Sequence, residues 1–304
     1  MKKKIVVVGS INMDLVVSTP RVPVMGETVL GSGFAIVPGG KGANQAVAVA
    51  RLGGDVHMVG CTGNDVFGNA LIQNLSSDNI KVENIKVIDG CATGVAMIVV
   101  KDGDNFIVVD PGANAKLTPK MIEALENEIK DSFIVIIQLE IPLETVEKAV
   151  EIAKKHSVKV LLNPAPAAHL SDQLLAKVDI FTPNESECEI ITGIAINNIE
   201  DAKSAVEWLR KKGVSQVLVT LGENGVLYNR GGTIVHKPVP DVEVVDTTAA
   251  GDSFSGALAV ALSEGKDIDS SVDFANIVGT LSVMKKGAQT SIPYRCEVEA
   301  FEKK

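Results

Sequence analysis

The sequence lacks the features that mark membrane-bound, secreted and nucleic-acid-binding proteins. None of its apolar runs approaches the ~18 residues that a transmembrane helix needs. Only four apolar residues stand between the basic start and Gly9, too few for the core of a signal peptide. The net charge of −9 disfavours nonspecific binding to nucleic acid, which requires a basic surface. We therefore expect a cytoplasmic protein whose partners are neither membranes nor nucleic acids.

Cysteine and histidine are scarce and scattered. The four cysteines form no CxxC pair, and the four histidines form no HxH or HxxxH pair. Zinc ligands usually recur at such spacings, so the pattern does not indicate a zinc site, and we expect reduced thiols. Aromatic residues make up 4% of the chain against 46% for all hydrophobic residues, which predicts an aliphatic core.

Short apolar runs alternate with helical patterns along most of the C-terminal part of the chain. Helices are expected near 143–155, 185–193 and 201–212, and the 304 residues are enough for one large α/β domain or two smaller ones. This alternation is typical of βαβ units and predicts a mostly parallel central sheet flanked by helices. The expected strands are 3–9, 55–61, 133–140, 158–164, 178–184 and 215–222.

Two segments do not follow the alternation. Residues 14–37 carry prolines and glycines between short β-prone runs, and residues 93–110 read as a hairpin that turns at Asp102-Gly103. We interpret them as one small β layer built from two excursions off the main domain. Because a small sheet with an apolar face is marginal alone, this layer must cover or pair with something.

Polar side chains follow almost every predicted parallel strand. In open α/β sheets, ligands bind outside the carboxyl ends of the strands. The alternative is that such residues start turns and cap helices, and Asn184 is a good N-cap candidate. The residues in this row are Asn12, Asp14, Gln138, Glu140, Asn163, Asn184 and Thr220.

A glycine-rich motif opens a predicted helix, but neither it nor the turn after the first strand is a nucleotide-binding motif of the Walker or dinucleotide type. The first strand is followed by Gly9-Ser10-Ile11-Asn12 rather than GxGxxG. In "PGGKGANQA" (38–46) a glycine follows the lysine where a P-loop requires Ser or Thr. This motif predicts a turn whose backbone a ligand can approach closely, with Lys41 and Asn44 near the start of the helix.

The stretch "VDTTAAGDSFSG" (245–256) combines an anion-binding feature with a carboxylate. We predict a strand over 242–245, a small-residue turn, and a helix whose buried face carries Phe254, Leu258, Ala261 and Leu262. A helix N-terminus binds anions, phosphate above all. Asp252 at that position is either a helix cap or a base that acts beside a phosphate.

These motifs together resemble the PfkB-type sugar kinases, the family of the ribokinases. The similarity spans essentially the whole chain. It implies one ribokinase-like α/β domain over 1–304, with a β lid formed near 14–37 and 93–110. The motifs that carry it, in order, are "GSINMD" (9–14), "GETV" (26–29), "GGKGANQA" (39–46), "DPGAN" (110–114), "NPAPA" (163–167), "TPNESE" (182–187), "TLGENG" (220–225), "DTTAAGDSFSG" (246–256) and "KKGAQTSIP" (285–293).

The resemblance implies an ATP-dependent kinase and assigns the motif residues to roles. Asp252 would be the general base that takes the proton from the terminal hydroxymethyl group of D-ribose, giving ribose 5-phosphate. Another sugar or a nucleoside, such as deoxyribose, fructose or adenosine, is the alternative. The Ala249, Ala250 and Gly251 amides would form an anion hole for the transferring phosphoryl group. The implied sugar contacts are Asn12, Asp14, Gly40, Lys41, Asn44 and Glu140.

The family further implies ATP, Mg²⁺ and K⁺. A homodimer through the lid is expected on other grounds, because the apolar face of the β layer is most simply buried against the same face of a second chain. Asn184 and Glu187 would act near Mg²⁺ and the phosphates, while Thr220, Gly222, Gly225 and Asn276 would lie on the nucleotide side. The chain departs from the common family pattern at Ala249, which replaces a glycine, and at Ser253 and Ser255, which replace Thr and Asn. The residues implied at the monovalent-cation site are Asp246, Thr248, Ser282, Lys285, Gly287 and Ser291.

Overall fold

The computed structural model, which describes residues 2–101 and 104–303, has a central sheet of nine strands. These strands are β1 (Lys4–Val8), β4 (Asp55–Gly63), β5 (Lys81–Ile88), β8 (Ile134–Ile137), β9 (Lys159–Leu162), β10 (Ile180–Phe181), β11 (Gln216–Thr220), β12 (Val226–Arg230) and β13 (Thr233–Lys237). Their order is β13-β12-β11-β10-β9-β8-β1-β4-β5. All neighbouring pairs from β11 to β5 are parallel, and β12 and β13 add an antiparallel hairpin at one edge. The predicted fold class is confirmed.

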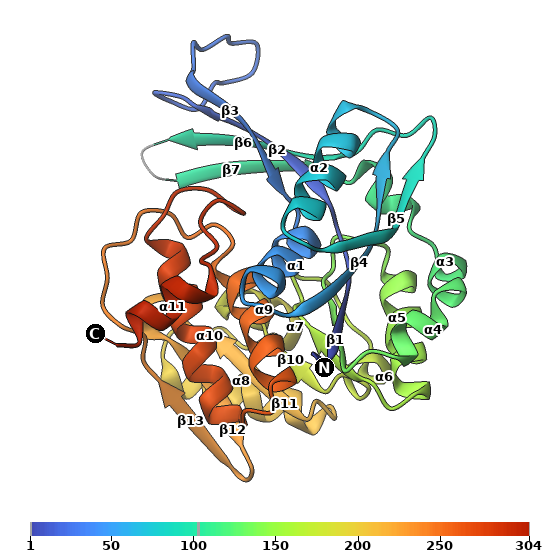
Figure 1. Cartoon of the computed structure of the whole chain (residues 1–304). Coiled ribbons are helices and arrows are strands. Elements are labelled where there is room, and N and C mark those ends of the chain that lie inside the picture. The colour runs from blue at the N-terminus through green and yellow to red at the C-terminus, as the bar shows by residue number, and fades with distance from the viewer. Residues whose placement is uncertain (1, 102–103, 304) are drawn as a thin grey trace.

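Helices cover both faces of the sheet (Figure 1). Successive strand residues point to opposite faces, so Ile5 and Val7 of β1 belong to one buried cluster and Val6 and Val8 to the other. The first face is covered by α1 (Lys41–Arg51), α2 (Val66–Ser77), α9 (Ala250–Ser263), α10 (Ile268–Val283) and α11 (Arg295–Phe301). The second is covered by α3 (Pro119–Ala124), α4 (Glu126–Lys130), α5 (Leu143–Lys155), α6 (Asp172–Leu175), α7 (Glu185–Thr192) and α8 (Ile199–Lys211).

A second, four-stranded sheet stands beyond the central one, at the top of Figure 1. It consists of β2 (Asn12–Ser18), β3 (Ser32–Gly39), β6 (Gly94–Lys101) and β7 (Asp104–Asp110), in the order β3-β2-β6-β7. Both excursions therefore form one small β layer, as predicted. The predicted turn at Asp102-Gly103 lies outside the described residues.

One face of this small sheet is apolar and exposed. The strand register places Ile36, Leu15, Met97 and Val108 side by side across the four strands. Ile36, Met97 and Val108 are 52%, 57% and 67% exposed. Asp14 lies one residue out of phase with this row, so it belongs to the opposite face.

The prediction of a strand over 242–245 is wrong, because within the described chain these residues form irregular coil. Val244 and Val245 are more than half exposed, and the Val245 amide donates to the carbonyl of Val283 at the end of a helix. The apolar, β-branched residues of this segment favour a strand locally, but a strand also needs a partner strand.

Over the described residues, none of the helices is long and apolar enough to cross a membrane.

Candidate active site

The start of α1 packs against the chain between β1 and β2, and glycine makes this approach possible. A Cβ atom on Gly40 would lie 2.6 Å from the Asn12 nitrogen, and one on Gly42 would lie 2.6 Å from the Ser10 nitrogen. Gly40 also has a positive φ of 88°, and the Ala43 amide donates to the Ser10 carbonyl at 2.9 Å. The first turn of α1 is thereby fixed beside the carboxyl end of β1.

Glu140 connects three of the segments that meet at this edge. Its Oε2 atom accepts hydrogen bonds from Ser10 Oγ at 2.6 Å, the Lys41 amide at 3.3 Å and Asn12 Nδ2 at 3.4 Å. Asn114, in the 3₁₀ helix η1 (Gly112–Lys116), donates from Nδ2 to Asn12 Oδ1 at 2.7 Å. Because the Asn12 oxygen is engaged by that donor, its Nδ2 is directed towards Glu140 and the site.

Asp14 is a carboxylate held in an unfavourable environment. Its side chain is 8% exposed and packs so closely on Gly39 that a Cβ there would lie 2.2 Å from Oδ2. Burial, followed by the negative charges of Glu140 and Asp252, raises the pKa of Asp14 to about 7, although Lys41 opposes the shift. Burial disfavours the charge of Lys41, but the surrounding carboxylates outweigh it and raise the pKa of Lys41. The site is therefore an acidic cluster around one lysine.

Asp252 lies in the first turn of α9 but does not cap it. The N-cap residue is Ala249, in the left-handed conformation with φ of 60°, and within the described structure no side chain caps this helix end. The Asp252 carboxylate instead accepts hydrogen bonds from two amides of α1. Asn44 Nδ2 lies 2.9 Å from Oδ2, and Gln45 Nε2 lies 2.9 Å from Oδ1. These contacts leave the carboxylate buried at the active-site edge rather than on the helix terminus.

The turn before α9 does not leave free all the amides that the resemblance implies for the anion hole, which are those of Ala249, Ala250 and Gly251. The Ala250 amide donates to the Thr247 carbonyl at 3.2 Å, so it is already engaged. At a helix start the next amides, those of Gly251 and Asp252, have no carbonyl one turn earlier in the helix. Gly251 is exposed and the space beside it is open. An anion at this turn would therefore meet chiefly the amides of Gly251 and Asp252.

Asn184 and Glu187 form a capping box at the start of α7. Asn184 Oδ1 accepts from the Glu187 amide at 2.8 Å, and Glu187 Oε2 accepts from the Asn184 amide at 2.9 Å. Burial raises the pKa of Glu187, and the charges of Lys41 and Asp252 also act on it, so it shares the field of the site. Thr220 pairs with Asn184 through a parallel bridge, which places the end of β11 beside this cap.

The predicted nucleotide-side residues come from two elements. Gly222 and Gly225 lie around the 3₁₀ helix η2 (Gly222–Asn224) and have φ angles of 53° and 87°. A Cβ on Gly225 would lie 2.1 Å from the Lys237 carbonyl, so only glycine fits there. Asn276 is buried on α10. The role of Asn276 at the nucleotide stays a prediction.

Asp246 fastens the turn before α9 to the segment after α10. Its Oδ1 atom accepts from the Thr248 amide at 2.9 Å and from Thr248 Oγ1 at 2.6 Å, and Oδ2 accepts from the Gly287 amide at 2.8 Å. Burial alone would raise the pKa of Asp246, but these hydrogen bonds outweigh it and lower the pKa. Asp246 is thus kept as a carboxylate, which suits a cation.

The other predicted cation-site side chains turn to different partners. The Ser282 and Ser291 hydroxyls donate to carbonyls three residues earlier, and Lys285 Nζ bonds to Glu297. Lys285 could reach a cation only through its backbone, whereas each serine oxygen keeps its lone pairs after donating its hydrogen. Among the described residues there is no cluster of three or more Asp, Glu, His or Cys side chains that could hold a metal. A cation here would therefore depend on one carboxylate and on hydroxyl or carbonyl oxygens.

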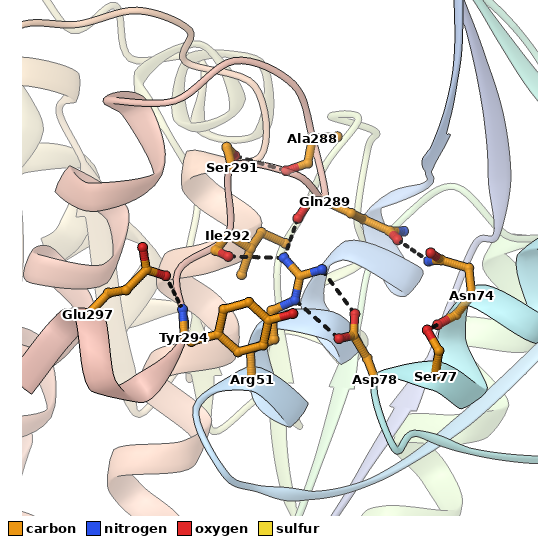
Figure 2. A network of polar contacts seen from close by, with 10 residues as sticks. All are labelled: Arg51, Asn74, Ser77, Asp78, Ala288, Gln289, Ser291, Ile292, Tyr294 and Glu297. Carbon is orange, nitrogen blue, oxygen red and sulfur yellow. Dashed lines mark hydrogen bonds and ion pairs between the residues drawn. The ribbon is translucent and has the colours of Figure 1, made fainter.

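Arg51 ties the segment that follows α10 to α1 and α2. Figure 2 shows its guanidinium between the carboxylate of Asp78 and two backbone carbonyls. Nη2 lies 3.1 Å from Asp78 Oδ2, Nη1 donates to the carbonyls of Gln289 and Ile292, and the guanidinium stacks on the Tyr294 ring at 4.9 Å. The same helix thus carries Asn44 near its start and this anchor at its end.

Several residues of this edge were given no role from the sequence, although Gln138 was part of the row of polar residues at the strand ends. Ser10, Gln45, Asn114 and Gln138 are each at most 1% exposed and lie in or beside the predicted site. Gln45 had a usable signal, because it is a polar residue within the alanine- and valine-rich helix of "KGANQAVAVA". Buried amides in such a setting require partners, which predicts a polar network without saying where it leads.

Comparison with known proteins identifies this arrangement. The pfkB family of carbohydrate kinases matches residues 2–295. The chain belongs to this family. A ribokinase from Haemophilus influenzae is 43% identical over 302 residues, 99% of each chain. A deoxyribokinase from Salmonella typhi is 39% identical over 291 residues, 95% of each chain. The structure of Arabidopsis thaliana ribokinase complexed with ribose and ATP superimposes with a TM-score of 0.94 at 34% identity, covering 100% of both chains.

Membership in this family establishes the class of reaction as ATP-dependent phosphorylation of a sugar. The enzyme must bring a sugar hydroxyl to the terminal phosphate of ATP and neutralise the charge that develops. The edge described above brings together polar groups of the kind that bind sugar hydroxyls, a buried carboxylate and a helix N-terminus.

Proposed function

We propose that this pfkB-family enzyme transfers the γ-phosphoryl group of ATP to the terminal hydroxymethyl oxygen of D-ribose, giving ribose 5-phosphate. One observation carries the proposal: Asp252, held by Asn44 at 2.9 Å, lies in the first turn of α9. A base for the sugar hydroxyl and an amide site for the phosphoryl group thus come from a single helix start, and phosphoryl transfer depends mainly on such positioning.

Ribose is favoured by the relatives and by the polar groups of the site. Ribokinases are 43% identical to the chain over nearly its whole length. Asn12, Asp14, Lys41, Asn44 and Glu140 offer donors and acceptors for a sugar rich in neighbouring hydroxyls, with the Gly40 backbone close beside them. The second candidate is deoxyribose, because a deoxyribokinase is 39% identical. Fructose and adenosine are further alternatives.

The protein's own groups account for the steps around the reacting oxygen. Asn12, Asp14 and Glu140 orient the sugar, and Asp252 accepts the proton of the terminal hydroxyl as that oxygen attacks phosphorus. The Gly251 and Asp252 amides at the start of α9, with Ala249 and Ala250 shaping the turn, stabilise the negative charge on the phosphoryl oxygens. Lys41 contributes a positive charge to the same field.

ATP with Mg²⁺ is proposed to bind beside the end of β11. Thr220, Gly222 and Gly225 present backbone along the end of β11, and we place the adenine near Asn276. Glu187 keeps one carboxylate oxygen, Oε1, outside its capping bond, and Mg²⁺ commonly binds through a single carboxylate and water. When bound, Mg²⁺ neutralises and orients the phosphates. Asn184 holds Glu187 in place.

A monovalent cation, K⁺, is proposed beside Asp246. The Asp246 carboxylate and the carbonyls near Thr248, Ser282, Lys285, Gly287 and Ser291 would supply its oxygens. These segments are already joined by the Asp246–Gly287 bond. The ion would fix the turn that precedes α9 without touching either substrate.

The exposed face of the small sheet is proposed to pack on the same face of a second copy of the chain. Its apolar row is on the side opposite Asp14, so the sheet can cover the sugar with one face and a partner with the other. A contiguous apolar surface of this kind indicates an interface, and an isologous dimer is the simplest arrangement. The lid would then be braced by its partner as it closes over the sugar.

The assignment of substrate is tested by measuring ADP release with a panel of pentoses, hexoses and nucleosides. Ribose should give the highest kcat/KM, because every polar group of the site is then engaged. Phosphorus NMR of the product should place the phosphate on the terminal carbon of ribose. A higher kcat/KM for deoxyribose or adenosine would contradict the assignment of ribose and leave the kinase class intact.

A further inference from the structure

Gln45 contacts the reacting carboxylate from inside the protein and has no assigned role. It is the fifth residue of α1, it is 0% exposed, and its Nε2 donates to Asp252 Oδ1 at 2.9 Å. Asn44, the preceding residue, donates to the other oxygen and is 6% exposed. The two amides therefore grip both oxygens of Asp252, one from the interior and one from the side that opens to the site.

The orientation of the Gln45 amide is fixed by its other partners. Nε2 also donates to Asn163 Oδ1 at 3.1 Å, and Oε1 accepts from Gln138 Nε2 at 2.6 Å. Asn163 is fixed in turn, because its Nδ2 donates to the Thr182 carbonyl at 2.8 Å. A carbonyl and a carboxylate can only accept, so the amide of Gln45 has one orientation that satisfies them all.

This network accounts for part of the row of polar residues at the strand ends. Gln138 follows β8, Asn163 follows β9 and Thr182 follows β10, and all three are buried. Through Gln45 they connect three neighbouring strands of the central sheet to one carboxylate on α9. Rigid elements hold a side chain more accurately than a loop does.

We infer that Gln45 is a positioning residue for Asp252: it holds Oδ1 inside the protein so that Oδ2 faces the sugar hydroxyl. This inference rests on the proposed role of Asp252 as the base. The geometry is demanding, because the carboxylate of a general base must lie within hydrogen-bonding reach of the proton it takes. A second hydrogen bond, donated by the side-chain amide of Gln45, prevents the rotation of the carboxylate that one hydrogen bond from Asn44 would allow. The neighbouring charges of Asp14 and Glu187 also repel Asp252, so the carboxylate needs restraint.

The test replaces Gln45 with methionine, which keeps the length of the side chain but removes its donors. We expect kcat to fall by roughly 10- to 100-fold while KM for ATP stays within about twofold, because substrate contacts are retained. Gln138→Met provides a milder variant, since it removes only the support of Gln45 and should lower kcat less. Gln216→Met is the control: its amide donates to the Asn229 carbonyl on the far hairpin, and its loss should leave kcat unchanged.

A double-mutant cycle separates positioning from general damage. If Gln45 acts through Asp252, then adding Gln45→Met to Asp252→Asn should lower kcat by less than about threefold, because groups that act as a unit are not additive. A full, additive loss in that background would overturn the inference, as would a Gln45→Met enzyme with wild-type kcat. Near-normal turnover of Asp252→Asn alone would remove both the proposed base and this inference. If Asp252→Asn loses turnover but Gln45→Met keeps a normal kcat, the positioning role of Gln45 is wrong and the proposed base still stands.

Discussion

The Nδ2 atom of Asn44 lies 2.9 Å from Oδ2 of Asp252, although 208 positions separate the two residues. The contact depends on the close packing of α1 against α9. Gly256 permits it, because a Cβ atom there would lie 2.7 Å from the Cβ of Ala48. The motifs "GGKGANQA" (39–46) and "DTTAAGDSFSG" (246–256) therefore lie side by side in the fold, and a small residue in the second motif, Gly256, allows this packing.

Replacing Asp252 with asparagine should abolish most of the activity. The substitution keeps the size of the side chain but removes the group that takes the proton, and loss of a general base costs roughly 10²–10⁴-fold in rate. Ribose binding, measured by calorimetry, should change little because the other sugar contacts remain. Turnover close to that of the wild type would show that another group acts as the base.

Asp14→Asn should stabilise the ligand-free chain at neutral and alkaline pH. The folded state raises the pKa of Asp14 to about 7 from an ordinary value of 3.8. The folded chain therefore binds the proton of Asp14 more tightly than the unfolded chain does. This contribution to stability is fully present below the unfolded pKa and is lost as the pH rises through about 7. Asparagine does not ionise, so its advantage over the wild type should grow across this range.

The measurement is urea unfolding of both proteins at several values between about pH 4 and pH 8. Asp131→Asn, at an exposed position after α4, is the control and should show no such trend. A difference between Asp14→Asn and the wild type that is independent of pH would contradict the predicted shift. The variant should also bind ribose more weakly, since Asp14 is one of the proposed sugar contacts.

The sequence predicts those parts of the structure that depend on local pattern. Residues 143–155 were expected to be helical and form α5 with the same bounds, because apolar residues recur there at helical spacing. The expected helices near 185–193 and 201–212 match α7 and α8 to within two residues. The order of strands and helices also predicts the parallel sheet.

What the sequence does not reveal depends on packing between distant segments. The bonds from Gln45 reach residues 93, 118 and 207 positions away, so no local pattern shows where its amide points. Val242–Val245 shows the opposite failure, in which local propensity predicts a strand that has no partner strand in the described fold.

Arg51→Met should destabilise the fold strongly. The guanidinium and the Asp78 carboxylate are only 14% and 12% exposed, and removing one partner leaves the other charge buried without compensation. Such a loss costs about 3–5 kcal/mol in the free energy of unfolding for a fully buried pair, and this part-buried pair should lie at or below the lower end of that range. Chemical denaturation would measure it. Arg21→Met, which breaks the exposed pair with Glu27, is the control and should leave stability unchanged. Equal effects of the two substitutions would contradict the importance of the buried network in Figure 2.

The apolar face of the small sheet should hold two chains together. Light scattering should report about twice the chain mass of 32.0 kDa. Val108→Asp should shift the protein to the monomer, because Val108 is 67% exposed on that face, on the edge strand β7, and a buried unpaired charge is unfavourable. Ile190→Asp, at a 53% exposed position on α7 away from the small sheet, is the matched control. A strictly monomeric wild type would refute the dimer and leave the kinase assignment standing.

Potassium should activate the enzyme more than sodium or a bulky organic cation does. Asp246 joins the turn before α9 to Gly287, and an ion held there would fix the amides that are proposed to bind the phosphoryl oxygens. All salts must be compared at matched ionic strength, because general screening affects them alike. Asp246→Ala should remove most of the difference between K⁺ and the other cations and should also lower the basal rate, since the turn loses its anchor. Equal activity in K⁺, Na⁺ and the organic cation would show that Asp246 serves only to hold the turn. A variant that keeps the full K⁺ response would instead place the ion elsewhere.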